Sequence, residues 1–451
     1  MLKNKLRSRV TKAAMSLTLL GLLSAAGLAA LAACEGPEGP AGPAGGIGPA
    51  GPAGTAGPQG SAGQPGTSPD GGALTTSCMA PCHGFNGIVD QWKTSTHYFG
   101  AIANLEEEAA WTNPNATCGN CHATDGLPTR LAGQYTVASG VDAGPQNAKT
   151  GQLNYPKSGG GTSEIGYGGK AALAIIGCTT CHDAFTNDPH VTGANYTKGS
   201  FKLRVPTGPN DEATLEKSPS AGTFTGTPAG KMGASNSCVY CHKSRKDVSN
   251  YITASNNLTS PHWGPHEAPH ADVFTGKGGY HYASKTYINS THQTGTCGTC
   301  HMPKVTANGG YPDHSFRPQI SSCVGTGCHA TGTINAELNT SRGVFIAALK
   351  DLQRVLNAKG LLTRQTASGP APQLTVAELA DNQFALDKVR NPGAAVTADE
   401  AGALYNYLMI ARAGALGAHN PFYTRQLIFD SYAAVRDVSD PATPSTIPTR
   451  P

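Results

Sequence analysis

The chain has 451 residues, of which 38% are hydrophobic and 14% are charged, while Gly and Pro contribute 57 and 32 residues. This composition provides few side chains for a large apolar core, yet the formal net charge of +4 is too small for a disordered chain. The interior must therefore be filled by something other than side chains, or the fold must be unusually open. The length allows roughly two to four domains.

The positive net charge comes entirely from the N-terminus. Residues 1–33 contain five basic residues and no acidic one, and the rest of the chain has 28 basic and 29 acidic residues. No run of Lys or Arg follows residue 33. We therefore expect no nucleic-acid partner.

Residues 1–33 have the pattern of an export signal, because the basic stretch is followed by apolar and small residues from Ala13 to Ala33. The sequence Leu31-Ala32-Ala33-Cys34 resembles a bacterial lipobox. That resemblance implies cleavage before Cys34, a lipid on its thiol and, with Glu35 next, sorting to the outer membrane, with the cell surface and the periplasmic face both open. The alternative is an uncleaved anchor, since about 20 apolar residues span a bilayer.

Residues 34–72 are the predicted spacer. Gly occupies every third position from Gly36 to Gly66, and Pro often follows it, which is the period of a collagen triple helix. So short a run favours an extended, Pro-rich stalk between Cys34 and the rest of the chain. The alternative is a true triple helix, which would make the whole protein a trimer.

Apart from Cys34, the 13 Cys residues form six pairs, and each pair is followed directly by His. Four pairs have two intervening residues, the spacing of c-type haem attachment, whereas the first has three and the last has four. The six motifs are Cys78, Cys82 and His83; Cys118, Cys121 and His122; Cys178, Cys181 and His182; Cys238, Cys241 and His242; Cys297, Cys300 and His301; and Cys323, Cys328 and His329.

The chemistry of haem c accounts for this spacing. The two thiols add to the two vinyl groups of one porphyrin, and the His that follows reaches the iron as its proximal ligand. Structural zinc sites would group the pairs in fours, and disulfides would not require a His after every second Cys. We therefore expect six haem c groups.

Nine further His residues are available as distal ligands, so every haem can have two His ligands. Their sequence context selects His97, His190, His266, His292, His314 and His419. The reserves are His262, His270 and His281. The sequence leaves open which of His262, His266, His270 and His281 binds iron. Ligation by Met is not expected, and ligation by two His implies low reduction potentials.

The predicted fold is mostly irregular, with loops that wrap haems and a few α-helices. Residues 73–335 form the predicted haem-binding region, residues 336–436 a helical C-terminal region and residues 437–451 a tail. In the helical region, residues 341–358 place apolar side chains on one helical face. Thr397 and Glu400 form a capping box that opens a second helix, to about Ala415, and a third helix is expected to follow Pro421 and to run through Arg425–Val435.

The six motifs, the lipobox and the Gly-rich spacer together resemble the multihaem outer-surface cytochromes of metal-reducing bacteria. Residues 280–329 and 418–421 are similar to segments common in multihaem cytochromes. The resemblance implies respiratory electron transfer to a metal oxide, a soluble metal or a partner cytochrome. Some hexahaem members of the group stack into filaments, so self-assembly is a further expectation.

Two other functions are weighed against electron transfer. A multihaem reductase of nitrite, hydroxylamine or a sulfur oxyanion would keep one haem open to substrate. The ammonia-forming nitrite reductases typically have Lys in place of one motif His, and no motif here has it. An adhesive trimer built on the spacer would leave the haems without a role. We therefore expect an electron carrier rather than an enzyme.

Overall fold

The computed structural model describes part of the chain, which divides into two units, Met1–Gln64 and Pro65–Pro451. All described residues belong to the second unit. They are residues 82–83, 87–103, 111, 118–131, 135–137, 140–142, 157–158, 161–162, 174–183, 202–205, 213–214, 223–224, 232–244, 247–252, 258–304, 310–325, 328–366, 371–390, 393–437 and 450. The predicted export signal, the predicted lipidation site Cys34, the predicted spacer, Cys78 and His190 lie outside them, as does most of the predicted tail.

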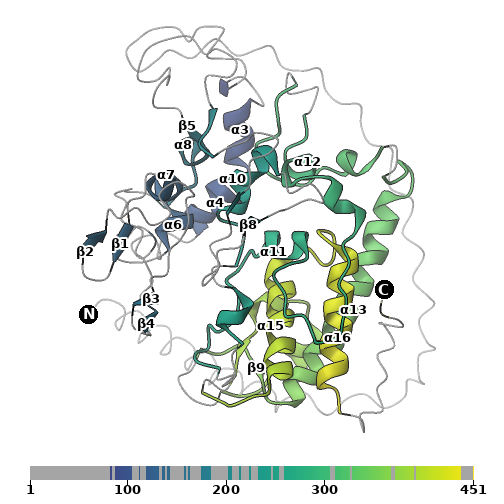
Figure 1. Ribbon diagram of the computed structural model, residues 1–451. Helices are drawn as coiled ribbons and strands as arrows, with labels where there is room; N and C mark the ends of the chain where they lie inside the picture. The colour runs from purple at the N-terminus through teal and green to yellow at the C-terminus, as the bar shows by residue number, and fades with distance from the viewer. Residues whose placement is uncertain are drawn as a thin grey trace, which may run out of the picture. The chain divides into compact units, whose positions relative to one another are not determined.

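The part of the chain that carries the motifs is rich in loops and contains short helices (Figure 1). The α-helices are α3 (Ile88–Lys93), α4 (Thr96–Ala103), α6 (Gly119–His122), α7 (Gly126–Leu131), α8 (Cys178–Cys181), α10 (Asn236–Val239), α11 (His270–Thr275) and α12 (Cys297–His301). Short 3-10 turns lie at Gly233–Ser235, Val248–Asn250, Thr291–Thr294 and Ile320–Cys323.

The strands are short and pair only in twos, all antiparallel, in the part of the chain that is described. The pairs are β1 (Tyr135–Val137) with β2 (Gly140–Asp142), β3 (Lys157–Ser158) with β4 (Gly161–Thr162), β5 (His182–Asp183) with β6 (Lys202–Leu203), β7 (Ala213–Thr214) with β8 (Thr223–Phe224), and β9 (Leu362–Thr363) with β10 (Lys388–Val389). The fold is therefore loop-rich and lacks an extended sheet among these residues.

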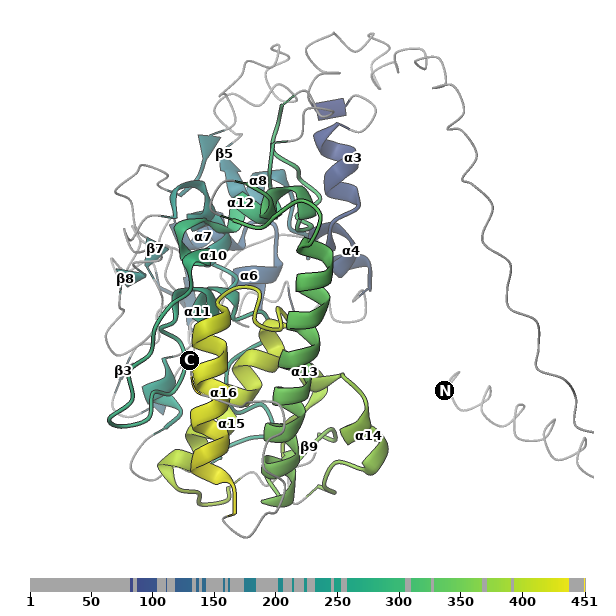
Figure 2. The same cartoon turned by 90° about the vertical axis from the view of Figure 1, so that its right-hand side faces the viewer.

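The C-terminal region is helical, as the sequence predicts. Helices α13 (Ile334–Ala358), α15 (Ala398–Ala413) and α16 (Pro421–Val435) pack side by side, with the short α14 (Val376–Ala380) and a 3-10 turn at Phe384–Leu386 between α13 and α15 in the chain (Figure 2). The main hydrophobic core lies between these helices and includes Leu352, Leu404 and Leu427, which are fully buried. Leu258, Trp263 and Val273 from the motif-bearing region complete this core.

The ends of these helices agree with their local sequence, with one difference. Thr397 accepts a hydrogen bond from the Glu400 backbone N–H in the predicted capping box, and Gly414 ends α15 in the left-handed conformation, with φ +64°. Asn420 caps α16, which begins at Pro421, where the third helix is expected. Helix α13 starts at Ile334 rather than at 341. Its first turns escaped prediction because, after the buried Ile334, they are mostly exposed and lack the apolar stripe.

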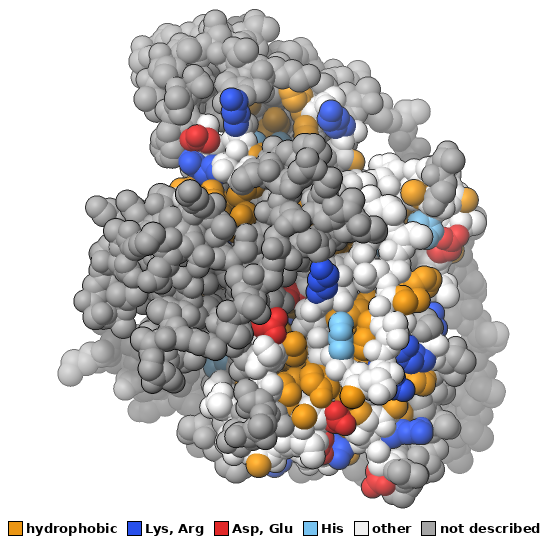
Figure 3. Space-filling model, in the orientation of Figure 1, with side chains coloured by type: hydrophobic (Ala, Val, Ile, Leu, Met, Phe, Trp, Pro, Cys, Tyr) orange, Lys and Arg blue, Asp and Glu red, His pale blue; other side chains and the backbone are white. Residues whose placement is uncertain are grey.

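None of the helices in the described ranges is long and apolar enough to cross a membrane. The described surface on the face drawn in Figure 3 carries basic and acidic side chains interspersed with apolar ones. A second, smaller hydrophobic cluster lies among the motifs and contains Leu127, Val205, Met232, Val239, Tyr240, Ala271 and Phe274.

Candidate haem-binding sites

Four of the motifs lie on or beside single helical turns. Helix α12 contains the fifth motif, α6 the second apart from Cys118, and α8 the two Cys of the third, whose His182 begins β5, while α10 leads into the fourth. The backbone N–H of His122 donates to the Cys118 carbonyl at 3.0 Å, and that of His242 donates to Cys238 at 2.9 Å. Each turn thus brings the His back beside the first Cys of its own motif, which is the local geometry that attachment of one haem requires.

The last motif has a different local structure, because four residues separate its two Cys. A 3-10 turn ends at Cys323, and the His329 backbone N–H donates to the Cys323 carbonyl at 3.1 Å. An isolated bridge also joins Val324 to His329. The longer loop therefore still returns His329 to the first Cys of the motif.

Five motif His rings each lie beside a different His from elsewhere in the chain. The centroid distances run from 5.9 to 6.3 Å. The pairs are His122 with His266, 6.2 Å; His182 with His314, 6.3 Å; His242 with His97, 5.9 Å; His301 with His419, 6.2 Å; and His329 with His292, 6.1 Å.

These distances fit one iron between the two rings of each pair. A metal–imidazole bond is about 2 Å long and the ring centroid lies about 1 Å farther, so two imidazoles on opposite sides of one metal have centroids about 6 Å apart. All five of the non-motif His residues belong to the predicted distal set. The sixth motif His, His83, is exposed, and the remaining predicted ligand, His190, lies outside the described residues.

Backbone carbonyls orient several of these rings. The Nδ1 atoms of His292, His301 and His314 lie 2.7, 2.8 and 2.9 Å from the carbonyl oxygens of Ala418, Phe316 and Pro312. A carbonyl only accepts, so Nδ1 carries the proton and Nε2 is left with its lone pair. That is the tautomer in which a His binds a metal through Nε2.

His329 has a charged partner instead. Its Nδ1 lies 2.7 Å from Oε2 of Glu337, an acidic residue in the first turn of α13. The Thr333 hydroxyl donates to the other carboxylate oxygen. Sequence reasoning missed Glu337, although an acid eight residues after a motif His, at the start of a helix, could have been noted.

Burial keeps several of these imidazoles neutral. Burial lowers the pKa of His242 to about 3 and that of His419 to about 4, with smaller contributions from neighbouring His rings. Burial also lowers the pKa values of His97 and His314. A metal ligand must be the neutral imidazole, so the fold favours the form that can bind iron.

The three reserve His residues have other surroundings. His262 is exposed. The His281 ring stacks on Tyr287, with centroids 4.2 Å apart, and its Nε2 lies 2.8 Å from the hydroxyl oxygen of Tyr423. The ring centroid of His270 lies 5.2 Å from those of His242 and His419, a shorter distance than in any of the five pairs.

Four Met residues follow the predicted export signal, and none of them is an expected iron ligand. Met232 is buried in the smaller cluster and Met409 in the main core. Met302 is half-buried directly after the fifth motif, and Met79 lies outside the described residues.

Thiols of different motifs come close to one another. Cys121 of the second motif and Cys241 of the fourth share a hydrogen bond that raises the pKa of Cys241. Cys238 of the fourth motif shares one with Cys297 of the fifth, which raises the pKa of Cys238. The fourth motif therefore lies between the second and the fifth. Taken with the paired His rings, the Cys and His residues present fit c-type haem.

Comparison with known proteins agrees with this chemistry. No family model matches the chain. A search of curated proteins finds the C-type polyheme cytochrome OmcB of Geobacter sulfurreducens, 26% identical over an alignment of 289 positions that covers 54% of this chain and 37% of the relative. It also finds the C-type polyheme cytochrome OmcC of the same species, 28% identical over an alignment of 242 positions that covers 45% of this chain and 30% of the relative. The chain thus spans about a third of the length of these relatives.

Among solved structures, the search finds the outer cell wall cytochrome OcwA, with a TM-score of 0.37 and 16% identity over 78% of this chain and 50% of the other. The similarity to polyhaem cytochromes therefore rests on the two sequence relatives. Over about half of its length, this chain is similar to polyhaem c-type cytochromes.

Proposed function

We propose that the chain carries six covalently bound haem c groups and passes single electrons between them by hopping. The observation that best supports this proposal is the pairing of five motif His rings with five different His residues at 5.9–6.3 Å. Two His ligands per iron would leave no position for a substrate. Such a protein is a carrier, and its task is to fix the spacing and the potentials of its haems.

The roles of the chain's own residues follow from their positions. In each motif the two Cys would attach the haem and the His after them would bind its iron. The second His ligands would be His97, His190, His266, His292, His314 and His419. When bound, haem supplies one-electron chemistry, while the backbone carbonyls at Nδ1 keep the axial rings in the binding tautomer.

Contacts between motifs suggest an order for electron transfer. The Thr180 hydroxyl beside the third motif donates to the Thr124 carbonyl beside the second at 2.7 Å. Arg130, after the second, donates to the Tyr240 carbonyl inside the fourth at 3.1 Å. Gln319, before the sixth, donates through its backbone N–H to the Cys300 carbonyl of the fifth at 3.1 Å. With the thiol contacts, these support the order third, second, fourth, fifth and sixth.

The rest of the proposal concerns location. We propose an exported, lipid-anchored protein that uses residues 34–72 as a spacer from the outer membrane. It would then pass electrons to an extracellular metal acceptor or to a partner cytochrome, alone or in a filament or trimer. Membrane fractionation of the wild type and a Cys34→Ala variant tests the anchor, since only the wild type should float with outer membranes.

The central experiment is resonance Raman spectroscopy of the purified protein in both redox states, with carbon monoxide added to the reduced form. We expect six haems per chain by pyridine haemochrome assay, all six-coordinate and low-spin, and no carbon monoxide binding. One haem that is high-spin or binds carbon monoxide would overturn the carrier assignment in favour of a reductase.

Two variants test the ligand pairing. His419→Ala should leave six haems attached but open one of them to carbon monoxide, because His419 is the partner of His301. His281→Ala is the matched control, since its Nε2 faces Tyr423, and it should leave all six haems low-spin. Carbon monoxide binding by the control variant, or its absence in His419→Ala, would contradict the pairing.

A further inference from the structure

In the sixth motif, a carboxylate faces the motif His. In three of the paired rings that have a hydrogen bond at Nδ1, the acceptor is a neutral backbone carbonyl alone. His266 also faces a carbonyl, that of Glu267 at 3.2 Å, with the Glu267 carboxylate at 3.5 Å. His329 instead donates its Nδ1 proton to a carboxylate oxygen of Glu337 at 2.7 Å.

The chain holds this carboxylate in place from two sides. The Glu337 backbone N–H donates to the Thr333 carbonyl at 3.0 Å as α13 begins, and the Thr333 hydroxyl donates to Oε1 of the same side chain. Oε2 is then left to face His329. The carboxylate is therefore a fixed part of the site and not a freely rotating surface group.

A fixed carboxylate at Nδ1 has an electronic consequence at Nε2. It draws the Nδ1 proton toward itself, which makes the imidazole a stronger donor to any metal on its other nitrogen. A stronger donor and a nearby negative charge both favour ferric over ferrous iron, because the ferric state carries one more positive charge. The reduction potential of that haem falls.

We propose that Glu337 is a positioning residue that lowers the reduction potential of the haem attached at Cys323 and Cys328. This inference rests on the proposed function, and it makes the sixth site a low-potential end of the series. The site is also partly open, since the side chains of His329 and Glu337 are 38% and 47% exposed. An electron donated there by an external carrier would move on toward the fifth motif.

The test is a potentiometric titration of the full protein, followed by optical and electron paramagnetic resonance spectra, for wild type and Glu337→Gln. Gln keeps the size and a hydrogen-bond acceptor but removes the charge. We expect one of the six midpoint potentials to rise while the other five stay unchanged. A tenfold weaker preference for ferric iron corresponds to about 59 mV for a one-electron couple.

Two further variants test whether the position of the Glu337 carboxylate matters and whether the loss of any nearby charge has the same effect. Thr333→Val keeps Glu337 but removes its second hydrogen bond, and it should raise the same potential by less. Glu267→Gln removes a charge near His266, but the backbone carbonyl at 3.2 Å remains, so its shift should be smaller than that of Glu337→Gln.

The outcomes separate this inference from the proposed function. Six low-spin haems in the wild type support the function regardless of the variants, and a different count or spin state contradicts it. If Glu337→Gln keeps six low-spin haems and its helix content while all six potentials are unchanged, Glu337 has no electronic effect on that haem and the inference is wrong. A shift as large in Glu267→Gln would also overturn it.

Discussion

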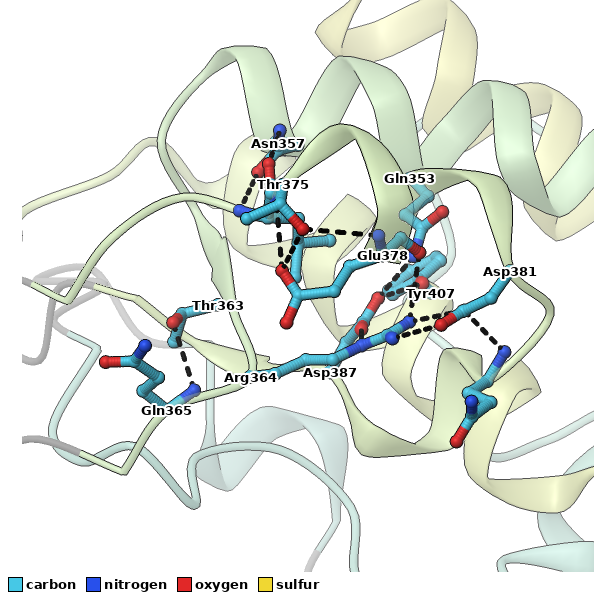
Figure 4. Close-up of polar contacts among 12 residues, drawn as sticks. Gln353, Asn357, Thr363, Arg364, Gln365, Thr375, Glu378, Asp381, Asp387 and Tyr407 are labelled. Carbon is cyan, nitrogen blue, oxygen red and sulfur yellow. Dashed lines mark hydrogen bonds and ion pairs between the residues drawn. The ribbon is translucent and has the colours of Figure 1, made fainter. Parts of the chain in front are cut away.

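Arg364 directly follows β9, and its side chain connects two acidic residues, Asp381 and Asp387 (Figure 4). Its Nε donates to Asp387 at 2.8 Å, and its two terminal nitrogens donate to Asp381 at 2.6 and 2.8 Å. Asp387 is fully buried and also accepts hydrogen bonds from Tyr407 on α15 and Gln353 on α13. A buried carboxylate needs such partners, because an unpaired buried charge is costly.

Replacing Arg364 should therefore destabilise the helical region strongly. Among the described residues, Arg364 is the only ion-pair partner of the Asp387 carboxylate, and Arg364→Ala removes it. We therefore expect a loss of about 3 kcal/mol in the free energy of unfolding. Urea unfolding followed by far-ultraviolet circular dichroism measures it. Lys388→Ala, which removes an exposed hydrogen bond to Thr366, is the control and should cost less than about 0.5 kcal/mol. Equal losses would contradict the assigned role.

The same cluster predicts how acid affects stability. Arg364 lowers the pKa of Asp381 from 3.8 to about 2, so this carboxylate stabilises the folded chain above pH 4, and that contribution is lost as the pH falls from about 4 to 2. In Asp381→Asn the stability should fall less over this interval. Urea midpoints of both proteins at pH 2, 3, 4 and 5 measure the difference. Parallel curves would show that Asp381 does not contribute.

Residue types and spacing predicted the Cys and proximal His, because both thiols and the His of one haem lie within a few residues of each other. The distal set was predicted by context, and five of its members lie beside motif His rings. Their pairing could not be predicted. His97 precedes the second motif yet faces His242 of the fourth, because loops of irregular length carry no register that fixes such contacts.

At the scale of elements, the packing of α15 depends on Gly402, because the ring of Tyr280 lies directly against it. Gly402 lies in the buried N-terminal half of α15, and a Cβ built there would overlap the ring of Tyr280. Tyr280 is held beside the helix by two hydrogen bonds with the side chain of Asn406. The loop before the fifth motif therefore lies directly on α15, and this contact joins the motif-bearing part of the chain to the helical core.

Gly-to-Ala substitutions on two helices should have opposite effects. Gly343 lies on the exposed half of α13, where nothing lies within 4 Å of a new Cβ, so Gly343→Ala should stabilise by about 0.5–1 kcal/mol through helix propensity. Gly402→Ala should instead destabilise by about 1–3 kcal/mol, because overpacking exceeds that gain.

Urea unfolding of both variants measures these changes. A Gly402→Ala protein as stable as Gly343→Ala would mean that Tyr280 can move away at no cost, and that the loop is not fixed on α15. Haem content of both variants serves as the control, since neither site touches a motif residue.

Helices with strong local signals were predicted closely, and the reason is physical. The Thr397 and Glu400 capping box and the αL glycine at Gly414 satisfy terminal backbone groups locally, so their sequence suffices. The start of α13 at Ile334 could not be found from periodicity, because Asn335–Val344 is exposed and its apolar pattern is weak.

At the scale of the whole molecule, the described residues form two apolar clusters of unequal size. The main core is drawn from residues 258–435, whereas the smaller cluster among the motifs has seven buried members in the described ranges. The low hydrophobic content and abundant Gly of the sequence are consistent with this difference. In the proposed protein, porphyrin rings add apolar surface to the small cluster among the motifs.

This difference predicts what happens when haem is withheld. A chain lacking residues 1–33 and made in a cytoplasm without haem-attachment machinery should keep α13, α15 and α16, because their packing uses side chains. The segments from 82 to 244 should lose protection, since burial there depends on haem. Hydrogen exchange of the apo and haem-loaded chains, read by mass spectrometry, would show protection retained in α15 and lost around α6 and α8. Uniform loss along the whole chain would mean that the helical core also needs haem, through the contact of His419 with His301.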